Sequence, residues 1–287
     1  MTELLAGSPM LLYPAAIIFG LLIGSFLNVV ILRLPKRMMY DWQQQSREFL
    51  DENPDPIAYP PGLVWPRSRC NQCGHTISAM ENIPLFSYLF LRGRCRSCKT
   101  KISLRYPIFE LLTAAASVAI VWKFGFSPAS AWGLVLTWCL IALSGIDLDH
   151  QILPDNITLP LIWLGLLSSV FGVFTDPVSS IIGGLAGYLS LWLVYQAFRL
   201  LTGKEGIGFG DFKLFAALGT WLGWQQLPLI ILLSSLIGAI AGLMLIIFTK
   251  HDKRKPIPFG PYLALAGWVA LIWGDALRAW YFQISGL

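Results

Sequence analysis

Charged residues are scarce in this 287-residue chain. Lys, Arg, Asp and Glu together make up 13% of it, whereas a soluble domain carries about a quarter of such residues. Hydrophobic residues reach 55% of the chain, and the mean hydropathy is +0.62. The charged stretches that would separate the helices of a soluble protein are mostly missing. This shortage argues against a soluble globular protein, and we expect a membrane protein.

Several familiar sequence patterns are also missing. The chain has only three His and no HExxH pair, which argues against a zinc metalloprotease. No Gly-rich nucleotide-binding fingerprint with an acidic partner occurs. Glu3 is the only charged residue before the first hydrophobic run, so we expect no cleaved signal peptide. We interpret His150 as a residue at the membrane rim and His251 as a solvated residue of a basic segment.

Eight hydrophobic runs predict helices, and Pro, Gly or charged residues separate them. The runs cover residues 10–32, 107–124, 128–146, 156–175, 178–200, 212–224, 227–249 and 258–282. The run at 212–224 is the weakest, because it is too short to cross a bilayer at a rise of about 1.5 Å per residue. The fold class expected is an all-α polytopic membrane protein with about eight transmembrane helices.

The positions of Lys and Arg predict the orientation in the membrane. With the N-terminus in the periplasm, four loops face the cytoplasm, namely 33–106, 147–155, 200–211 and 250–257. Only Lys123 and Arg278 then fall at the other face, and basic residues favour the cytoplasmic side. The net charge of +5 is explained by this orientation and by attraction to anionic membrane lipid. It requires no nucleic acid as a partner.

Four of the five cysteines form two CxxC pairs within the loop 33–106. They are Cys70, Cys73, Cys95 and Cys98. Four thiolates at this spacing predict one tetrahedral Zn²⁺ with no open position for water, and therefore a structural ion in a small zinc-ribbon-like domain. A reducing cytoplasm argues against disulfides. A rubredoxin-like iron site stays open, since tetrahedral thiolates also suit iron.

Two aspartates stand at the ends of hydrophobic runs. Asp147 lies in SGIDLDHQILPD at the end of the third run, and Asp211 lies in GIGFGDFKL at the start of the sixth. A charged side chain at the centre of a bilayer costs roughly 2.5–3.5 kcal/mol on insertion scales, so acids in membrane segments usually have a role and a partner. Two carboxyl groups brought together cannot both ionise easily, and a proton shared between them is the chemistry of aspartic proteases. We interpret Asp147 and Asp211 as a catalytic pair at the cytoplasmic rim.

The neighbours of these aspartates have supporting interpretations. Asp149, two residues further along a helix, should face away from Asp147. Asp155 is expected to be the N-cap of the fourth helix. Lys213 could lower the pKa of a carboxyl group or contact lipid headgroups, and we favour the headgroups.

Three glycines precede Asp211, and one cysteine lies alone in the third run. Gly206, Gly208 and Gly210 allow close approach of the backbone to a substrate and unusual φ values, or they simply end one helix and begin the next. Cys139 is expected to be a small buried hydrophobic residue.

Several segments carry a resemblance to a known family. They are IGSFLNVVILRLP at 23–35, PRSRCNQC at 66–73, ENIPLFSYLFLRGRCRSC at 81–98 and ISLRYPIFE at 102–110. Together with the two aspartate segments they resemble type IV prepilin peptidases, which are the leader-peptidase and N-methyltransferase enzymes of type IV pili and type II secretion. The resemblance covers nearly the whole chain in order. The GxGD motif alone, Gly208 to Asp211, is less specific, because presenilin-like and preflagellin peptidases share it.

The resemblance implies roles for particular residues. Asp147 matches the first catalytic aspartate of the family, since Pro154 follows it, and Asp211 matches the second. The family cleaves the leader of prepilins and pseudopilins in the bacterial inner membrane, then methylates the new N-terminal residue, usually Phe, with S-adenosylmethionine. The residues that bind S-adenosylmethionine stay unassigned. Four residues match family segments without an assigned role, namely Glu81, Asn82, Arg92 and Glu110.

We expect three parts along the chain. Residues 1–32 form the first transmembrane helix, 33–106 a cytoplasmic zinc-binding loop with the methyltransferase region, and 107–287 the aspartic peptidase domain. Within the loop, residues 38–54 predict a short amphipathic helix at the membrane surface.

Three alternatives remain from sequence alone. One is a GxGD peptidase without methyltransferase activity. A proton-coupled membrane transporter would also use buried acids, but it predicts inverted repeats and charges near the middle of the membrane that we do not find. An assembly factor would use the zinc loop only for docking, and replacement of the aspartates would not affect it.

Overall fold

The structure is a computed structural model that describes residues 9–51, 58–204, 206, 208–249 and 257–285. The described part is helical, with two isolated β-bridges and no strand. Its elements are α2 (Pro9–Phe49), η1 (Met80–Asn82), α3 (Phe86–Phe90), α4 (Arg105–Phe124), α5 (Pro128–His150), α6 (Asp155–Val170), α7 (Pro177–Thr202), α8 (Phe209–Leu222), η2 (Trp224–Gln226), α9 (Leu227–Thr249) and α10 (Gly260–Ser285). They form two compact units, Met1–Phe126 and Ser127–Leu287.

All eight hydrophobic runs form helices, which confirms the all-α prediction, but fewer of them have the length of a membrane span. Among the described residues, six helices are long and apolar enough to cross a membrane, and α6 and α8 are shorter. The expected span at 156–175 ends at Val170. Gly172 adopts φ +60° and the Val173 N–H reaches the Ser168 carbonyl at 3.2 Å, which is a Schellman ending. The chain is therefore a multi-pass membrane protein.

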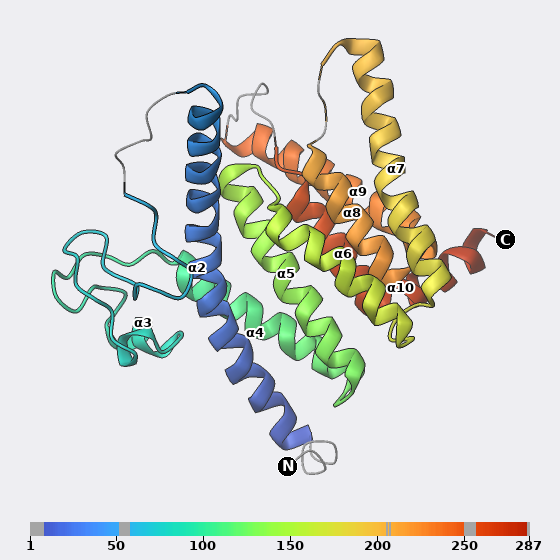
Figure 1. Cartoon of the computed structure of the whole chain (residues 1–287). Helices are drawn as coiled ribbons and strands as arrows, with labels where there is room; N and C mark the ends of the chain where they lie inside the picture. The colour runs from blue at the N-terminus through green and yellow to red at the C-terminus, as the bar shows by residue number, and fades with distance from the viewer. Residues whose placement is uncertain (1–8, 52–57, 205, 207, 250–256, 286–287) are drawn as a thin grey trace. The chain divides into compact units, whose positions relative to one another are not determined.

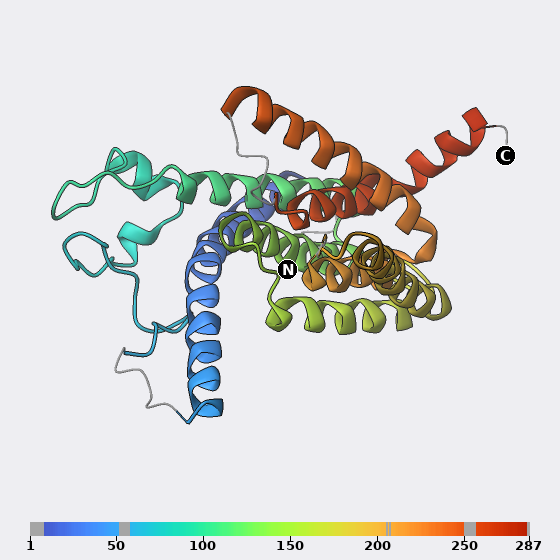
Figure 2. The same cartoon turned by 90° about the horizontal axis from the view of Figure 1, so that it is seen from above.

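The first unit contains a helix longer than we predicted. α2 does not end at residue 32 but continues to Phe49, so no separate surface helix begins at residue 38. It bends along its length (Figure 2), and Pro35 removes one of its helical hydrogen bonds. α4 packs against α2. Gly20 and Gly24 permit this, because a Cβ atom at either position would lie within 3 Å of the Cα atom of Ala114 or Glu110.

α8 is the central helix of the second unit. It contacts α6, α7, α9 and α10 (Figures 1 and 2), and every residue from Asp211 to Leu222 except Lys213 is buried. A helix that is hydrophobic all round is typical of a buried core. Gly183 of α7 and Gly219 of α8 face each other so closely that neither position has room for a Cβ atom.

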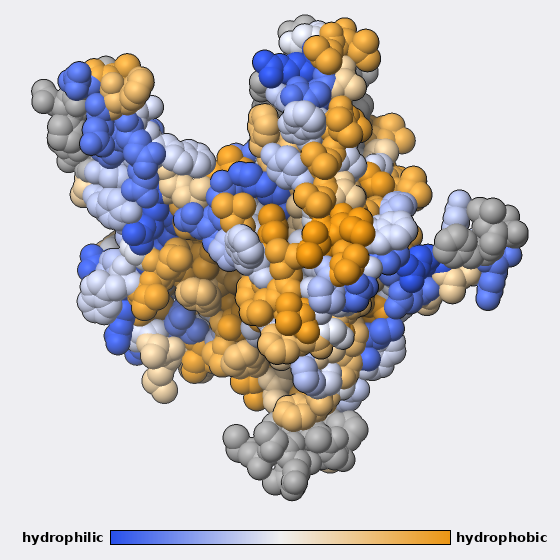
Figure 3. All heavy atoms as spheres, turned by 45° about the vertical axis from the view of Figure 1, so that its right-hand side comes forward, coloured by the Kyte–Doolittle hydropathy of each residue, from blue (hydrophilic) through white to orange (hydrophobic). Residues whose placement is uncertain are grey.

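The outer helices expose hydrophobic side chains instead of burying them. Figure 3 shows broad hydrophobic areas along the helices. On α9, Leu232, Leu236 and Leu243 are each more than half exposed. Lipid would cover such a surface, in agreement with the composition.

Candidate active site and metal centre

Asp147 lies in the last turn of α5 and is 5% exposed. The helix begins with Ser127 as its N-cap and ends when Gln151 adopts the left-handed conformation. The Asp147 Oδ2 atom accepts the backbone N–H of Gly260, the first residue of α10, at 3.0 Å. The carboxyl group is therefore held between the end of one helix and the beginning of another.

Asp211 lies in the first turn of α8 and is 8% exposed. Gly208 is the N-cap of this helix, and the Asp211 N–H donates to the Gly208 carbonyl at 3.1 Å. Asp211 Oδ1 is buried and has no hydrogen-bond partner among the described residues. Such an unsatisfied buried oxygen is costly, and it calls for a functional explanation.

The structure brings the two aspartates together. Asp147 Oδ2 lies against Gly260, and Asp211 directly follows Gly210 in the chain. Leu153 lies between the two backbones, because its side chain packs against both Gly210 and Gly260. The turn after α5 therefore joins the first turns of α8 and α10 into one site.

The neighbouring residues follow the predictions only in part. Asp149 is exposed while Asp147 is buried, as expected for residues that face different sides of a helix. The N-cap expected at Asp155 is wrong, since Pro154 occupies that position. Asp155 Oδ1 instead accepts from Lys213 Nζ at 2.6 Å. Lys213 therefore forms an ion pair with a carboxylate of the protein, whereas the sequence led us to expect a contact with lipid headgroups.

The glycines before Asp211 act through close packing and helix boundaries. Neither Gly208 nor Gly210 has a positive φ, so the expectation of unusual φ values is wrong there. Gly203, at φ +69°, ends α7 instead. Gly210 has no room for a Cβ atom, which would lie 2.7 Å from the Leu153 Cβ atom.

Sequence reasoning missed Gly260. Its contact with Asp147 joins residues 113 positions apart, and nothing in the sequence pairs them. A Cβ atom at Gly260 would lie 2.6 Å from Asp147 Oδ2. The one available signal was a Gly between two prolines, Pro258 and Pro261, at the start of a hydrophobic run.

The four predicted metal ligands converge in the first unit. The Sγ atoms of Cys70, Cys73, Cys95 and Cys98 lie within 4.8 Å of one another. The Sγ atoms of Cys70 and Cys98 are 3.7 Å apart. Tetrahedral Zn–S bonds of about 2.3 Å would place the sulfur atoms about 3.8 Å apart, whereas a disulfide requires about 2.05 Å. The four cysteines can therefore hold a metal ion.

The two CxxC turns have the same backbone design. In the first, the Cys70 N–H donates to the His75 carbonyl at 2.9 Å, and in the second the Cys95 N–H donates to the Thr100 carbonyl at 2.8 Å. The residue after each second cysteine has a positive φ, +70° at Gly74 and +60° at Lys99. Because the two turns have equivalent backbone conformations, each directs its two Sγ atoms toward the same centre, which explains why the four sulfur atoms lie together.

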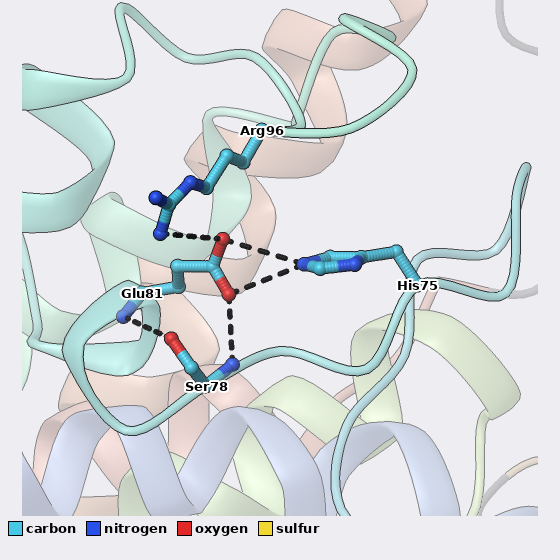
Figure 4. Close-up of polar contacts among 4 residues, drawn as sticks. All are labelled: His75, Ser78, Glu81 and Arg96. Carbon is cyan, nitrogen blue, oxygen red and sulfur yellow. Dashed lines mark hydrogen bonds and ion pairs between the residues drawn. The ribbon is translucent and has the colours of Figure 1, made fainter.

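Glu81 connects the two turns (Figure 4). Its carboxylate accepts the Ser78 N–H at 2.8 Å, while the Glu81 N–H donates to Ser78 Oγ, which is a capping box. His75, from the first turn, lies 3.3 Å from the carboxylate, and Arg96, from the second, lies 3.9 Å away. The bonds from Ser78, with His75, hold the pKa of Glu81 below its usual range.

We expect Glu81→Ala to loosen the metal site without removing a ligand. The substitution removes the acceptor that His75, Ser78 and Arg96 share, so the two turns can separate more easily. Metal release to a colorimetric chelator should be several-fold faster than in the wild type. Glu48→Ala, at an exposed position of α2, is the matched control; equal release rates for the two variants would show that Glu81 does not hold the turns together.

Glu110 forms a second polar contact in the first unit. This α4 residue is 7% exposed, and its carboxylate accepts the Leu85 N–H at 2.8 Å. Leu85 has φ +60° and ψ −50°, an uncommon conformation for a non-Gly residue. Asn28, on the facing helix α2, is 2% exposed, and its Oδ1 atom has no partner among the described residues.

The remaining predicted residues give less information. Asn82 ends η1, and Arg92 has φ +52°. His150 lies in the last turn of α5. Cys139, expected to be buried, is only partly buried on α5. His251 and the rest of the basic segment 250–255 lie outside the described residues.

Comparisons with known proteins give a consistent result. Residues 18–124 match the model described as Bacterial Peptidase A24 N-terminal domain, and residues 134–243 match the Type IV leader peptidase family. A protein of Aeromonas hydrophila named prepilin leader peptidase/N-methyltransferase is 54% identical over 97% of both chains. Proteins of the same name from Stutzerimonas stutzeri and Pseudomonas aeruginosa are 53% and 52% identical, over 99% of this chain and 99% and 98% of theirs. No solved structure matches the chain.

Proposed function

Because this chain belongs to the type IV leader peptidase family, we propose that it is a membrane-embedded aspartic endopeptidase and N-methyltransferase. It cleaves the leader peptide of type IV prepilins and pseudopilins and methylates the new N-terminal residue with S-adenosylmethionine. The observation that carries the peptidase activity is the buried pair Asp147 and Asp211, which the packing of Leu153 against Gly210 and Gly260 brings into one site.

The carboxyl pair supplies the chemistry of peptide hydrolysis. The ionised carboxylate takes a proton from the attacking water, and the protonated carboxyl group donates a hydrogen bond to the scissile carbonyl oxygen. Burial of both groups strengthens these interactions, because fewer water molecules screen them. A transporter would use such acids for ion relay, but the relatives carry the name of a peptidase.

The orientation of the chain suits such a substrate. The distribution of Lys and Arg supports a periplasmic N-terminus, with Asp147, Asp211 and the cysteine loop at the cytoplasmic face of the bacterial inner membrane. A prepilin with a short basic leader before a hydrophobic helix would present its leader on that face. Residues 33–106 would then carry the zinc site and the methyltransferase region, and residues 107–287 the peptidase.

The metal bound by the four cysteines is, in this proposal, one structural Zn²⁺. Four thiolates complete a tetrahedral shell and leave no position for a catalytic water. The loop between α2 and α4 has few buried hydrophobic side chains among its described residues, Cys95 being one of them. A bound ion would therefore supply the folding energy that the loop lacks.

S-adenosylmethionine would supply an electrophilic methyl group on a cationic sulfur. Two buried oxygen acceptors of the first unit fit a cationic ligand, the Glu110 carboxylate and Asn28 Oδ1. No described Lys, Arg or His pairs with Glu110. Glu110 would hold a cation, either of the methyl donor or of the substrate amine, and would keep Leu85 in place.

Glu110→Gln tests this placement. The amide keeps the size of the side chain and an oxygen that can accept the Leu85 N–H, but it removes the negative charge. We expect methylation of a cleaved pilin to fall by about tenfold or more, as for a lost charge-assisted interaction worth about 1.5–3 kcal/mol. Cleavage of the prepilin by the same preparation should stay within about twofold. Unchanged methylation would exclude a role for the charge.

The proposed function is tested by mass analysis of a model prepilin after incubation with the purified protein. With S-adenosylmethionine present, the mature product should carry one added methyl group at its N-terminus, and without it the product should be cleaved but unmethylated. Cleavage without methylation under both conditions would identify a peptidase without methyltransferase activity. No cleavage would exclude the peptidase and favour a transporter or an assembly factor.

A further inference from the structure

The two carboxyl groups of the pair have different surroundings. Asp147 Oδ2 accepts the Gly260 N–H in a buried hydrogen bond of 3.0 Å. Gly260 begins α10, a helix of 26 residues, whose N-terminus carries a partial positive charge. A hydrogen bond donated to a carboxyl group in its ionised form stabilises that form. The surroundings of Asp147 therefore favour the carboxylate.

Asp211 lacks such a donor on one of its oxygens. Its Oδ1 atom is buried without a partner among the described residues, and a buried charged oxygen without a partner is more costly than a neutral carboxyl group. A protonated carboxyl group has an O–H donor that it can give to a neighbouring acceptor. Asp211 also stands in the first turn of its own helix, α8, with the backbone of Gly208 close to its carboxyl group, so helix dipoles do not distinguish the two aspartates. The buried hydrogen bond of 3.0 Å from Gly260 to Asp147 and the buried Asp211 Oδ1 atom without a partner do.

We propose that Asp147 is the ionised member of the resting pair and the general base, and that Asp211 carries the shared proton. Gly260 is the positioning residue that fixes this division, through its N–H and its lack of a side chain. This inference rests on the proposed peptidase function and adds to it the role of each aspartate.

The assignment gives a balanced reaction. Water transfers a proton to Asp147 while its oxygen bonds to the scissile carbonyl carbon, and Asp211 transfers its proton to the carbonyl oxygen. When the C–N bond breaks, the leaving nitrogen takes the proton from Asp147. One hydroxyl proton of the diol returns to Asp211 as the carboxyl group of the leader forms. Both aspartates end in their starting states, and one water has been consumed.

The close packing around Gly260 explains why the position needs glycine. A Cβ atom would lie 2.6 Å from Asp147 Oδ2 and 3.2 Å from Leu153 Cδ1. Any larger residue must displace the carboxylate from the N–H that stabilises it. Gly260 has no positive φ, so its role comes from close approach and not from backbone freedom.

Gly260→Ala tests the positioning role. We expect kcat for prepilin cleavage to fall by about 10²-fold, as for a small displacement of a catalytic group, with KM and the methylation of a precleaved pilin unchanged. Gly242→Ala in α9 is the matched control, since its Cβ atom would meet only the flexible end of Ile257, at 3.3 Å. An unchanged kcat, or an equal loss of cleavage and methylation, would overturn the role of Gly260.

Infrared difference spectroscopy with ¹³C-labelled aspartate tests which carboxyl group is protonated at neutral pH. The C=O band of the protonated carboxyl group should be present in the wild type and in Asp147→Asn, and absent in Asp211→Asn. If both variants are inactive but the band disappears only in Asp147→Asn, the peptidase proposal stands and our assignment of roles is overturned. If both variants still cleave the substrate, the proposed function itself fails.

Discussion

Replacing either aspartate, as Asp147→Asn or Asp211→Asn, should lower the rate of prepilin cleavage by about 10³-fold or more. In the proposed mechanism each substitution removes one of the two groups that move protons during hydrolysis, and losses of this size are usual for such groups. The amide has nearly the same volume as the carboxyl group, and both side chains are buried. We therefore expect the variants to fold and to keep their methylation of a precleaved pilin.

Mass analysis of the reaction products measures both activities in one sample. Asp149→Asn is the matched control, because Asp149 lies two residues from Asp147 in the same helix but is exposed. It should cleave at the wild-type rate. If Asp147→Asn or Asp211→Asn cleaves the prepilin at a rate near that of the control, the buried pair is not the catalytic group.

Removal of one buried thiol, as Cys95→Ser, should empty the metal site and unfold the loop between α2 and α4. Cys95 is 7% exposed, and the binding free energy of a structural zinc site is about 10–16 kcal/mol, much of which is folding free energy. The variant should contain no zinc by elemental analysis, and trypsin should cut the loop at its arginines. Methylation should be lost with the fold of the loop.

Cys139→Ser serves as the control for that experiment. Cys139 lies on α5, outside the group of four cysteines, so this variant should keep one zinc per chain and the protease resistance of the wild type. A Cys95→Ser protein that still binds one zinc and resists trypsin would contradict the structural role of the metal. If elemental analysis finds iron and no zinc in the wild type, the identity of the ion is wrong but its structural role is not affected.

The sequence predicted the parts of the fold that depend on local composition. Each of the eight hydrophobic runs lies on one of the eight main helices that the structure describes, six of them long enough to span a membrane, since lipid requires apolar segments whatever surrounds them. The end of α2 was missed because Pro35 bends the helix without ending it, and the polar residues that follow remain helical. The N-cap of α6 was predicted at Asp155, one residue too late, because Pro154, with φ −62° and ψ 131°, has the extended conformation of the residue before the helix.

The functional residues could be predicted from the sequence only where they belong to a short sequence motif. The CxxC spacing led to a cluster of four sulfur atoms, because each pair is fixed by a local turn. Contacts across the fold had no such signal. The hydrogen bond from Gly260 to Asp147 and the ion pair of Lys213 with Asp155 depend on how the helices of the second unit pack.

Cross-linking of Asp147→Cys/Asp211→Cys in native membranes tests the central claim most directly. A protease site is inserted between α6 and α7 in a chain in which Cys139 is replaced and the four cysteines of the metal site are kept, and a short, reducible, thiol-specific cross-linker is added before cutting. We predict that the two fragments stay joined until a reductant releases the linker, while Asp149→Cys/Asp211→Cys fragments separate. Fragments of the first variant that separate without a reductant would contradict a catalytic pair formed by Asp147 and Asp211.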